Sequence, residues 1–437
     1  MRTNVIPEHL IKAEAEKCLG CFEPPCQAAC PAGINIPGFI NRILTGDHRN
    51  AARLIWEKNL LPSICGLVCP QEDLCRGACV AAQLNRTIDI GFLQYYAIVN
   101  GLQSADIVSF VPELENNPAV AVIGAGPSGI TCAYLLALAG CKVTIYEHEE
   151  ASGGTMSSYI PDHRLPKEVV EDDLKRLEHP NIKIEYNQTF GNEISLKELM
   201  NKNYKALFLA TGRTIEQKVT MPGCDFKGVY YYKEAFKQAR INSRIFQGKN
   251  VAVIGGGNVA MDTAVTLLAS GAESAVILYR RAEKDMPAWQ EEIEYARSQG
   301  VDFKFQVRPL SFVGNEKGEL AGIKMVMTVR DGCSSDGRTT YCDCEGTDFY
   351  LPVDQVVMAI GSTADQHLAE QLPNVLFSRN GLVEVDQHTM MTSHKGIFAG
   401  GDAVTTRGGT VVKAMAEGIA AARGIIEYLQ EGGGLSV

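Results

Sequence analysis

The sequence has no apolar segment long enough to cross a membrane and no recognisable signal peptide. The apolar stretch 130–141 is too short to span a bilayer, and residues 1–17 are polar and carry several charges. Basic residues nowhere form a block, and 41 basic against 51 acidic side chains give a formal net charge of -10. That balance argues against nucleic-acid binding. We therefore expect a cytoplasmic protein that binds neither membrane nor nucleic acid.

Several common catalytic signatures are missing as well. The sequence contains no His-Glu-x-x-His zinc helix, no nucleophile elbow and no Walker phosphate loop. Beyond the N-terminal region there is no Cys-x-x-Cys pair, so dithiol exchange of the thioredoxin-reductase type has no obvious site. We predict no catalytic side chain, and we expect any redox chemistry to be carried by cofactors.

Cysteine, in contrast, is abundant at the N-terminal end, where eight of the 14 cysteines lie within the first 79 residues. They form two tetrads, Cys18, Cys21, Cys26 and Cys30, then Cys65, Cys69, Cys75 and Cys79. Iron–sulfur clusters, zinc and disulfides compete to explain them. Disulfides are rare in a reducing compartment, and zinc sites favour pairs of short knuckles separated by a longer loop. The crowded spacing and the Cys-Pro steps favour iron–sulfur clusters.

A strand, a glycine-rich loop, a helix and a second strand follow one another between residues 119 and 147. The loop is Gly124-Ala-Gly-Pro-Ser-Gly129, and the apolar helix after it reaches Gly140. Its glycines let backbone N–H groups approach a pyrophosphate at a helix N-terminus, where the dipole favours anions. Glu147 ends the second strand and is placed to accept a hydrogen bond from a ribose hydroxyl. This unit predicts a dinucleotide-binding fold.

The same unit returns between residues 250 and 281. Its loop begins Gly255-Gly-Gly257-Asn258-Val259, and Arg280-Arg281 stands where Glu147 stands in the first unit. A cation there can pair with a 2′-phosphate that a carboxylate would repel, which favours NADP over NAD. The alternative is a solvated basic turn, because acidic and basic residues follow at once. We expect Gly255, Gly257, Asn258, Val259, Arg280 and Arg281 to contact NADP or NAD.

Two predicted strands end at residues 209 and 358, and each is followed within three residues by a glycine, Gly212 or Gly361. We interpret these two exits as the points where the chain crosses between the two folds. The sequence therefore predicts an α/β protein with two nested Rossmann-like dinucleotide-binding domains preceded by an α-helical iron–sulfur domain. We place these domains at residues 1–112 (helical), 113–225 (first dinucleotide fold, first part), 226–361 (second dinucleotide fold, for NAD(P)H) and 362–437 (first dinucleotide fold, second part).

The order of these segments resembles the N-terminal half of dihydropyrimidine dehydrogenase, the small subunit of glutamate synthase and the large subunit of ferredoxin–NADP transhydrogenase. The resemblance covers nearly the whole chain. It rests on the strings Cys18-Leu-Gly-Cys21, Cys65-Gly-Leu-Val-Cys69-Pro70, Ile88-Asp-Ile-Gly91, Tyr279-Arg-Arg281, Met286-Pro287 and Ala399-Gly-Gly-Asp402.

The resemblance implies two 4Fe-4S clusters with interleaved ligands. One would be held by Cys18, Cys21, Cys26 and Cys79, and the other by Cys30, Cys69, Cys75 and Gln94. Cys65 would then be a non-ligand. Gln94 matches an unusual glutamine ligand of dihydropyrimidine dehydrogenase, where glutamate synthase tends to place a glutamate. A glutamine on a helix surface is the plainer alternative.

The resemblance also implies that residues 113–225 and 362–437 bind FAD, and it implies the residues of the FAD site. Asp402 would bind the ribityl chain, and backbone amides of Thr410 and Val411 would face the flavin pyrimidine edge. The residues expected around FAD are Gly124, Gly126, Pro127, Ser128, Gly129, Glu147, Gly154, Arg164, Asp402, Thr410 and Val411.

Together these features predict a subunit that oxidises NAD(P)H through FAD and passes electrons through two 4Fe-4S clusters. The sequence shows no pyrimidine-reducing barrel or amidotransferase, so we expect the final substrate to be reduced on a partner subunit, in a uracil- or thymine-reducing complex of the dihydropyrimidine dehydrogenase type. A subunit like those of glutamate synthase or the transhydrogenase is one alternative. A flavin reductase with a zinc-structured, partner-binding head is another.

Overall fold

The computed structural model describes residues 7–103, 114–213, 215–241, 243–333, 339–365, 367–404 and 409–435. The predicted boundary at residues 112 and 113 therefore lies outside the described residues. The chain forms two compact units, one of residues 1–214 with 364–437 and one of residues 215–363. Residues 215–225, which the sequence assigned to the FAD domain, lie in the second unit.

The N-terminal part of the first unit, called the head here, is helical. Its helices are α1 (Glu8–Ala15), α2 (Pro25–Ala28), α3 (Ile36–Leu44), α4 (His48–Trp56), α5 (Pro62–Val68), α6 (Val80–Gln83) and α7 (Ile90–Gly101). Their starts follow from local chemistry, because Asn35, Asp47 and Asp89 accept hydrogen bonds from the first-turn N–H groups of α3, α4 and α7. Buried apolar side chains such as Phe39, Ile55 and Leu93 face a common core.

The apolar pattern of residues 36–56 is divided between two helices, α3 and α4. Gly46 adopts a positive φ of 75° between them, which glycine allows without steric cost. Asp47 then starts α4 by accepting a hydrogen bond from Asn50 N at 3.3 Å. The apolar period alone did not locate this break.

A five-stranded parallel sheet forms the centre of the first unit beyond the head. Its strand order is β16-β4-β1-β2-β3. The strands are β1 (Ala119–Ile123), β2 (Lys142–Tyr146), β3 (Ile182–Glu185), β4 (Ala206–Leu209) and β16 (Ile397–Ala399). Because β16 pairs with β4 in parallel, the chain returns after the second unit to complete this sheet, as the sequence predicted.

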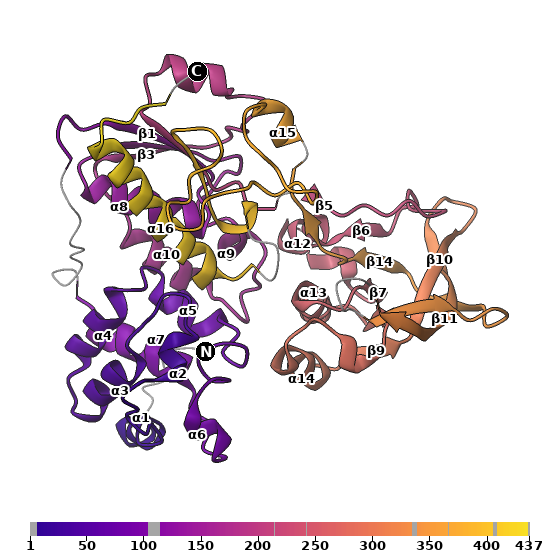
Figure 1. The fold of residues 1–437 in the computed structure, drawn as a ribbon. Helices are drawn as coiled ribbons and strands as arrows, with labels where there is room; N and C mark the ends of the chain where they lie inside the picture. Colours follow the sequence, from indigo (N-terminus) through magenta and orange to yellow (C-terminus); the bar gives the residue numbers. More distant parts are fainter. Residues whose placement is uncertain are drawn as a thin grey trace. The chain divides into compact units, whose positions relative to one another are not determined.

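Helices pack on this sheet, and the longest of them, α16, lies along α8 (Figure 1). The helices are α8 (Pro127–Leu138), α9 (Thr155–Ser158), α10 (Lys167–Lys175), α11 (Leu196–Asn201), α15 (His367–Gln371) and α16 (Val411–Gln430). The crossing of α16 over α8 requires a small residue, because a Cβ on Gly418 would lie 2.3 Å from the carbonyl oxygen of Ser128. This contact fixes α16 against the start of α8.

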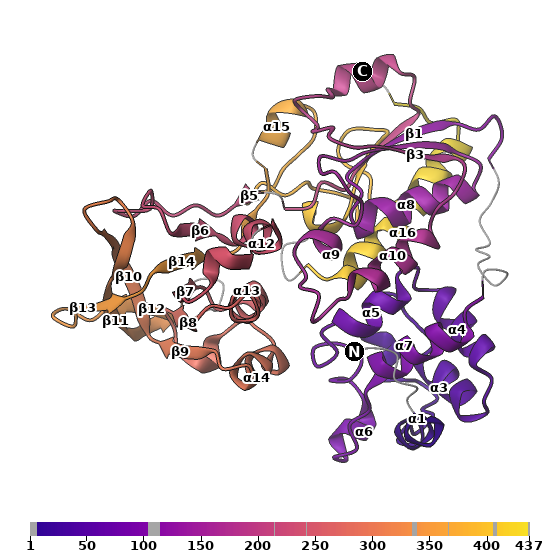
Figure 2. The same cartoon turned by 180° about the vertical axis from the view of Figure 1, so that it is seen from behind.

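The head shares its core with the sheet region of the first unit. Trp56, Leu61 and Ile64 from the head belong to the same apolar cluster as Leu136 of α8 and Met415 of α16. In Figures 1 and 2, α5 lies on the side of the head next to α10 and α16, whereas α1 and α6 lie on the far side. The head is therefore packed onto the sheet region through α5.

The second unit is built on another five-stranded parallel sheet, of order β6-β14-β7-β8-β9. Its strands are β6 (Val229–Tyr231), β7 (Asn250–Ile254), β8 (Ser274–Tyr279), β9 (Asp302–Phe305) and β14 (Gln355–Met358), and its helices are α12 (Tyr232–Ile241), α13 (Asn258–Ala269) and α14 (Gln290–Ser298), with 3-10 turns η2 (Ser243–Phe246) and η3 (Glu283–Asp285).

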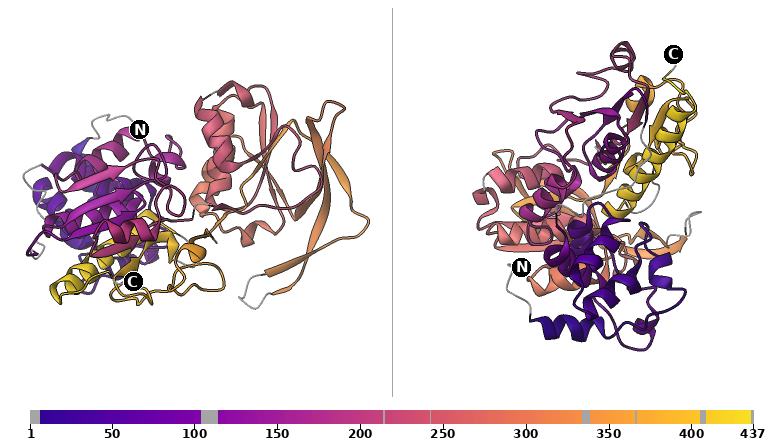
Figure 3. Two further views of the ribbon diagram at one scale, coloured as in Figure 1. Left: turned by 90° about the horizontal axis from the view of Figure 1, so that it is seen from above. Right: turned by 90° about the vertical axis from the view of Figure 1, so that its left-hand side faces the viewer.

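An antiparallel sheet completes this unit, and its long strands β10 and β11 stand out in orange in Figure 3. It contains β10 (Val307–Gly314), β11 (Leu320–Cys333), β12 (Thr339–Asp343) and β13 (Phe349–Pro352). The chain enters and leaves the unit through a short antiparallel pair, β5 (Ile215–Glu216) and β15 (Ser362–Thr363). The two parallel sheets confirm the predicted fold class. Among the described helices, none is long and apolar enough to cross a membrane.

Candidate functional site

The loop between β1 and α8 has the shape of a pyrophosphate cradle. Gly124 adopts a φ of 102°, and a Cβ at that position would lie 2.4 Å from the carbonyl oxygen of Ala210. A Cβ on Gly129 would lie 1.9 Å from the carbonyl oxygen of Gly124. No side chain caps α8, whose first residue is Pro127, so its first-turn N–H groups remain available to an anion.

Ser128 provides the clearest test of whether this loop fits a cofactor. Its side chain is buried, and within the described part of the chain its Oγ has no hydrogen-bond partner. The hydroxyl lies beside Gly400 and Gly401, at the carboxyl end of β16. Buried hydroxyls are normally hydrogen-bonded, so an unpaired one at this helix terminus fits a phosphate oxygen.

Glu147 is held in place by the loop it follows. Its carboxylate accepts hydrogen bonds from Ala125 N at 2.6 Å and Glu149 N at 2.9 Å, and His148 Nδ1 lies 2.8 Å away. Burial alone would raise the pKa of Glu147, but His148 and these N–H groups outweigh it and hold the pKa below its usual value. An ionised carboxylate has lone pairs left for a ribose hydroxyl.

Gly154, another of the predicted FAD residues, lies in a turn beside the same loop. Gly153 N donates to Ala125 O at 2.8 Å, and a Cβ on Gly154 would lie 3.1 Å from Gly126 Cα, so this turn packs directly on the first loop. Arg164 lies between α9 and α10, in the segment that follows this turn.

Asp402 lies close to the residue that precedes the N-cap of α16. Asp402 lies in the short turn η4 (Gly401–Ala403), and a Cβ on Gly409 would lie 2.0 Å from Asp402 Oδ1. Thr410 caps α16 by accepting from Lys413 N at 3.3 Å, and Val411 is its first residue. Burial raises the pKa of Asp402, and the charges of Arg213 and Lys413 oppose that shift.

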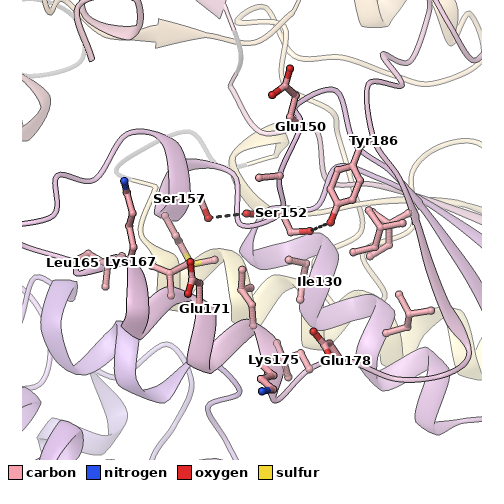
Figure 4. A pocket seen from close by; sticks show the side chains of 18 of the residues that line it. Ile130, Glu150, Ser152, Ser157, Leu165, Lys167, Glu171, Lys175, Glu178 and Tyr186 are labelled. Atoms are coloured by element: carbon pink, nitrogen blue, oxygen red, sulfur yellow. Dashed lines mark hydrogen bonds between the residues drawn. The ribbon is translucent and has the colours of Figure 1, made fainter. Parts of the chain in front are cut away.

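A cavity of about 1040 Å³ lies beside the first loop. Figure 4 shows Ile130 of α8 and Glu171 of α10 among its lining, with Ser152 hydrogen-bonded to Tyr186 at 2.8 Å. The residues predicted to bind FAD do not line it. The cavity therefore neighbours the predicted cofactor site without forming part of it.

The second glycine loop, between β7 and α13, is as tightly constrained as the first. A Cβ on Gly255 would lie 2.2 Å from Ala359 O, and one on Gly256 would lie 2.4 Å from the Tyr279 ring. Gly257 precedes α13, which no side chain caps and which begins Asn258-Val259. Asn258 Oδ1 accepts a hydrogen bond from Trp289 N at 2.9 Å, so this amide ties the start of α13 to the start of α14.

The two arginines after β8 stand at the edge of this sheet. The Arg280 side chain is exposed and that of Arg281 is half-buried. Within the described residues neither guanidinium is paired with a carboxylate. The turn is held by other groups, because Thr328 Oγ1 donates to Arg280 O at 2.6 Å and Tyr279 OH donates to Asp285 O at 2.6 Å. The Arg281 side chain hydrogen-bonds to the side chain of Tyr279, whereas the exposed Arg280 side chain extends from the edge of the sheet.

The head brings its cysteine thiols into two overlapping neighbourhoods, which the interaction of Cys26 with Cys75 links. In the first, burial raises the pKa of Cys26 to about 11, and the nearby thiols of Cys79 and Cys18 add to the shift. Burial also raises the pKa of Cys18, with further contributions from Cys79 and Cys21. The described cysteines form no disulfide. Free thiols gathered in this way are suitable cluster ligands.

In the second neighbourhood, burial raises the pKa of Cys75 to about 12, with Cys30 contributing. Two effects raise the pKa of Cys69 well above its usual value: the larger is a hydrogen bond with Cys65, and the next is burial. Cys65 and Cys69 are neighbours because α5 places them one turn apart, a spacing visible in the sequence. Among the described residues no three metal-ligating side chains stand together as a site for a metal ion.

Gln94 is buried on α7, with 6% of its surface exposed. Its Nε2 donates to Pro62 O at 2.7 Å, at the start of α5. This contact excludes the simple alternative of a solvent-exposed helix amide. The carboxamide oxygen has no hydrogen bond to another described residue.

Sequence reasoning missed Asp173 of α10, whose side chain is fully buried. It accepts a hydrogen bond from Ile64 N of α5 at 2.9 Å and pairs with Arg176. An acid in a charged helix gave no signal of this contact, because the partner lies 109 residues away in the sequence.

Two parallel sheets, each with an uncapped helix after a glycine loop, define a protein with two dinucleotide-binding folds. Residues 118–418 match the family model of pyridine nucleotide-disulphide oxidoreductases, and residues 2–105 match that of dihydropyrimidine dehydrogenase domain II, 4Fe-4S cluster. The chain belongs to the pyridine nucleotide-disulphide oxidoreductase family. It is an NAD(P)H-dependent flavin and iron–sulfur oxidoreductase, as the sequence predicted.

Known relatives match over almost the whole chain. The glutamate synthase (NADPH) small chain of Escherichia coli is 33% identical over 96% of this chain and 91% of its own length. The putative oxidoreductase AegA of E. coli is 34% identical over 95% of this chain, which spans only 65% of AegA. Mycobacterium tuberculosis FprA in complex with NADPH has the same fold, with a TM-score of 0.60 at 18% identity over 72% of this chain and 85% of FprA.

Proposed function

We propose that this chain is the electron-input subunit of a larger complex. It oxidises NADPH through FAD and passes the electrons through two 4Fe-4S clusters in the head to a partner subunit. One observation carries this proposal. The first unit contains both the cofactor loop with the unpaired Ser128 hydroxyl and a head rich in free thiols. The small-chain relative supports the expectation of a partner.

FAD supplies the step between two-electron and one-electron chemistry when it is bound, so no side-chain acid or base is needed for that conversion. The chain's own residues bind and orient. Glu147 would hold a ribose hydroxyl, and the start of α8 would hold the pyrophosphate beside Ser128. Arg280 and Arg281 would hold the 2′-phosphate of NADPH through charge-assisted hydrogen bonds.

For the clusters we propose the interleaved ligand sets given above. The neighbourhood of Cys18, Cys21, Cys26 and Cys79 supports the first set. Cys30, Cys69 and Cys75 support the second, and Gln94 would be its fourth ligand. Iron and acid-labile sulfide should each be found at about eight ions per chain, the content of two 4Fe-4S clusters. Zinc in place of iron would instead favour a zinc-structured head.

For the final acceptor we propose a pyrimidine-reducing partner of the dihydropyrimidine dehydrogenase type. The match of residues 2–105 to that enzyme's cluster domain and the buried position of Gln94 support this choice. A glutamate-synthase-type partner is the second candidate, favoured by the 33% identity to a glutamate synthase small chain.

The test is reconstitution. The loaded chain should reduce an artificial one-electron acceptor with NADPH, but it should reduce uracil only after its partner is added. Uracil reduction by the isolated chain would contradict the requirement for a partner. Identification of the protein that co-purifies with the chain decides between the pyrimidine and the glutamate candidates.

A further inference from the structure

A buried carboxylate from the sheet region holds the helix of the head that carries Cys65 and ends before Cys69. Asp173 projects from α10, and its Oδ2 accepts a hydrogen bond from Ile64 N of α5 at 2.9 Å. Ser63, the residue before Ile64, also hydrogen-bonds to it. None of the Asp173 surface is exposed, so this contact is sealed from water.

Both oxygens of the Asp173 carboxylate accept hydrogen bonds. Arg176, the residue directly after α10, donates to Asp173 Oδ1, and its Nη1 also lies 3.4 Å from Ser63 Oγ. A buried charge without partners would be strongly destabilising, and here a guanidinium and the N–H groups of α5 compensate it. Burial raises the pKa of Asp173 to about 6, and the bonds from Ile64, Arg176 and Ser63 oppose the shift.

By holding α5, Asp173 also holds residues around the second thiol neighbourhood. Three residues before Cys65, Pro62 O accepts the hydrogen bond from Gln94 Nε2 at 2.7 Å. The other end of α5 is closed by Cys69, whose N–H donates to Cys65 O at 3.2 Å. The middle of the helix is pressed against α7, because a Cβ on Gly66 would lie 2.9 Å from Gly91 O. A shift at the start of α5 would therefore move Gln94 and Cys69 together.

We propose that Asp173 is a positioning residue. It fixes α5, and with it the proposed second-cluster ligands Cys69 and Gln94, relative to the flavin-binding part of the same unit. Its negative charge near these ligands would also disfavour the reduced, more negative form of the cluster. The inference rests on the proposed function, since it assumes that Cys69 and Gln94 hold a cluster.

The test uses the full chain loaded with FAD and iron. In Asp173→Asn, NADPH should still reduce the flavin at a rate within about twofold of the parent, while electron transfer from flavin to cluster slows at least about tenfold, as expected when a donor–acceptor geometry is loosened. The cluster midpoint potential should rise, because a nearby negative charge is removed. Stopped-flow absorbance and a potentiometric EPR titration measure the two effects.

Asp172→Asn is the matched control, because Asp172 is the adjacent carboxylate on α10 and is exposed. It should leave both the rate and the potential unchanged. Ser63→Ala is the milder second variant, which removes one contact without touching the charge, and it should slow the same step in the same direction. If Asp173→Asn and Ser63→Ala both behave like Asp172→Asn, the inference is wrong.

The parent protein separates this inference from the proposed function. Cluster EPR signals that appear in the loaded parent and are reduced by NADPH support the proposed function, whatever Asp173→Asn does. A parent that holds no cluster overturns the proposed function and the positioning role with it. A parent with clusters and an unaffected Asp173→Asn variant overturns the positioning role alone.

Discussion

At the scale of single residues, Cys65 and Cys79, the first and last cysteines of the second tetrad, should differ in function. Cys79→Ser should lose the first cluster, about half of the iron, because a 4Fe-4S cluster normally needs all of its ligands. Cys65→Ser should keep its iron, although its hydrogen bond to Cys69 predicts a changed EPR signal. Iron and sulfide analysis of the two purified variants measures this difference. Loss of iron in Cys65→Ser would show that Cys65, and not Gln94, is the ligand.

The preference for NADPH depends on another pair of side chains. Replacing Arg280 and Arg281 with alanine should raise the KM for NADPH at least about tenfold, because each charge-assisted hydrogen bond to a phosphate contributes roughly 1.5–3 kcal/mol. The KM for NADH should stay unchanged, since NADH has no 2′-phosphate. Lys284→Ala, which removes an exposed cation from the same turn, is the control. Equal losses with both nucleotides would contradict the role given to these arginines.

At the scale of elements, the junction of α5 and α10 should make stability depend on pH in an unusual direction. Because burial raises the pKa of Asp173 to about 6 from 3.8, the folded chain binds this proton more tightly than the unfolded chain does. The contribution of Asp173 therefore becomes more stabilising as the pH falls through the folded pKa.

Relative to Asp173→Asn, the parent should gain about 1 kcal/mol in its free energy of unfolding between about pH 7.5 and about pH 5.5. Urea unfolding of both proteins at the two pH values measures the difference, and the variant corrects for all other titrating groups. A difference that stays constant or shrinks with falling pH would mean that Asp173 is not perturbed by burial.

The elements that the sequence predicted best are those with local signals. Each dinucleotide unit contains an apolar strand, a glycine loop and an apolar helix within about thirty residues, and steric contacts such as that of Gly124 with Ala210 explain why the glycines are required. The break between α3 and α4 depended on one glycine and one capping aspartate, which the apolar pattern did not separate. The contact of Asp173 with Ile64 joins distant segments and had no local signal.

At the scale of the whole molecule, the head and the sheet region of the first unit share one core, while the second unit has its own. Removal of iron should therefore loosen α5 and weaken the packing of Trp56 and Ile64 against the sheet region. We expect the thermal transition of the first unit to shift to lower temperature and that of the second unit to remain.

Calorimetry of the iron-loaded and iron-free chains measures these transitions. NADP added to each sample should raise the second transition by binding the folded second unit, which identifies it. If iron removal left the first transition unchanged, the head would not be part of that cooperative core.

By itself, the sequence determined the family-level character of this protein: two glycine loops after buried strands, an acid after one and arginines after the other, and a thiol-rich head. These signals are local, because a turn, a helix start and a ligand spacing are each encoded within a few residues. Only the tertiary structure decided which thiols are neighbours, that Gln94 is buried against α5, and that Asp173 joins the head to the flavin-binding part. Such contacts arise when distant segments pack and exclude water, and no short stretch of sequence encodes that packing.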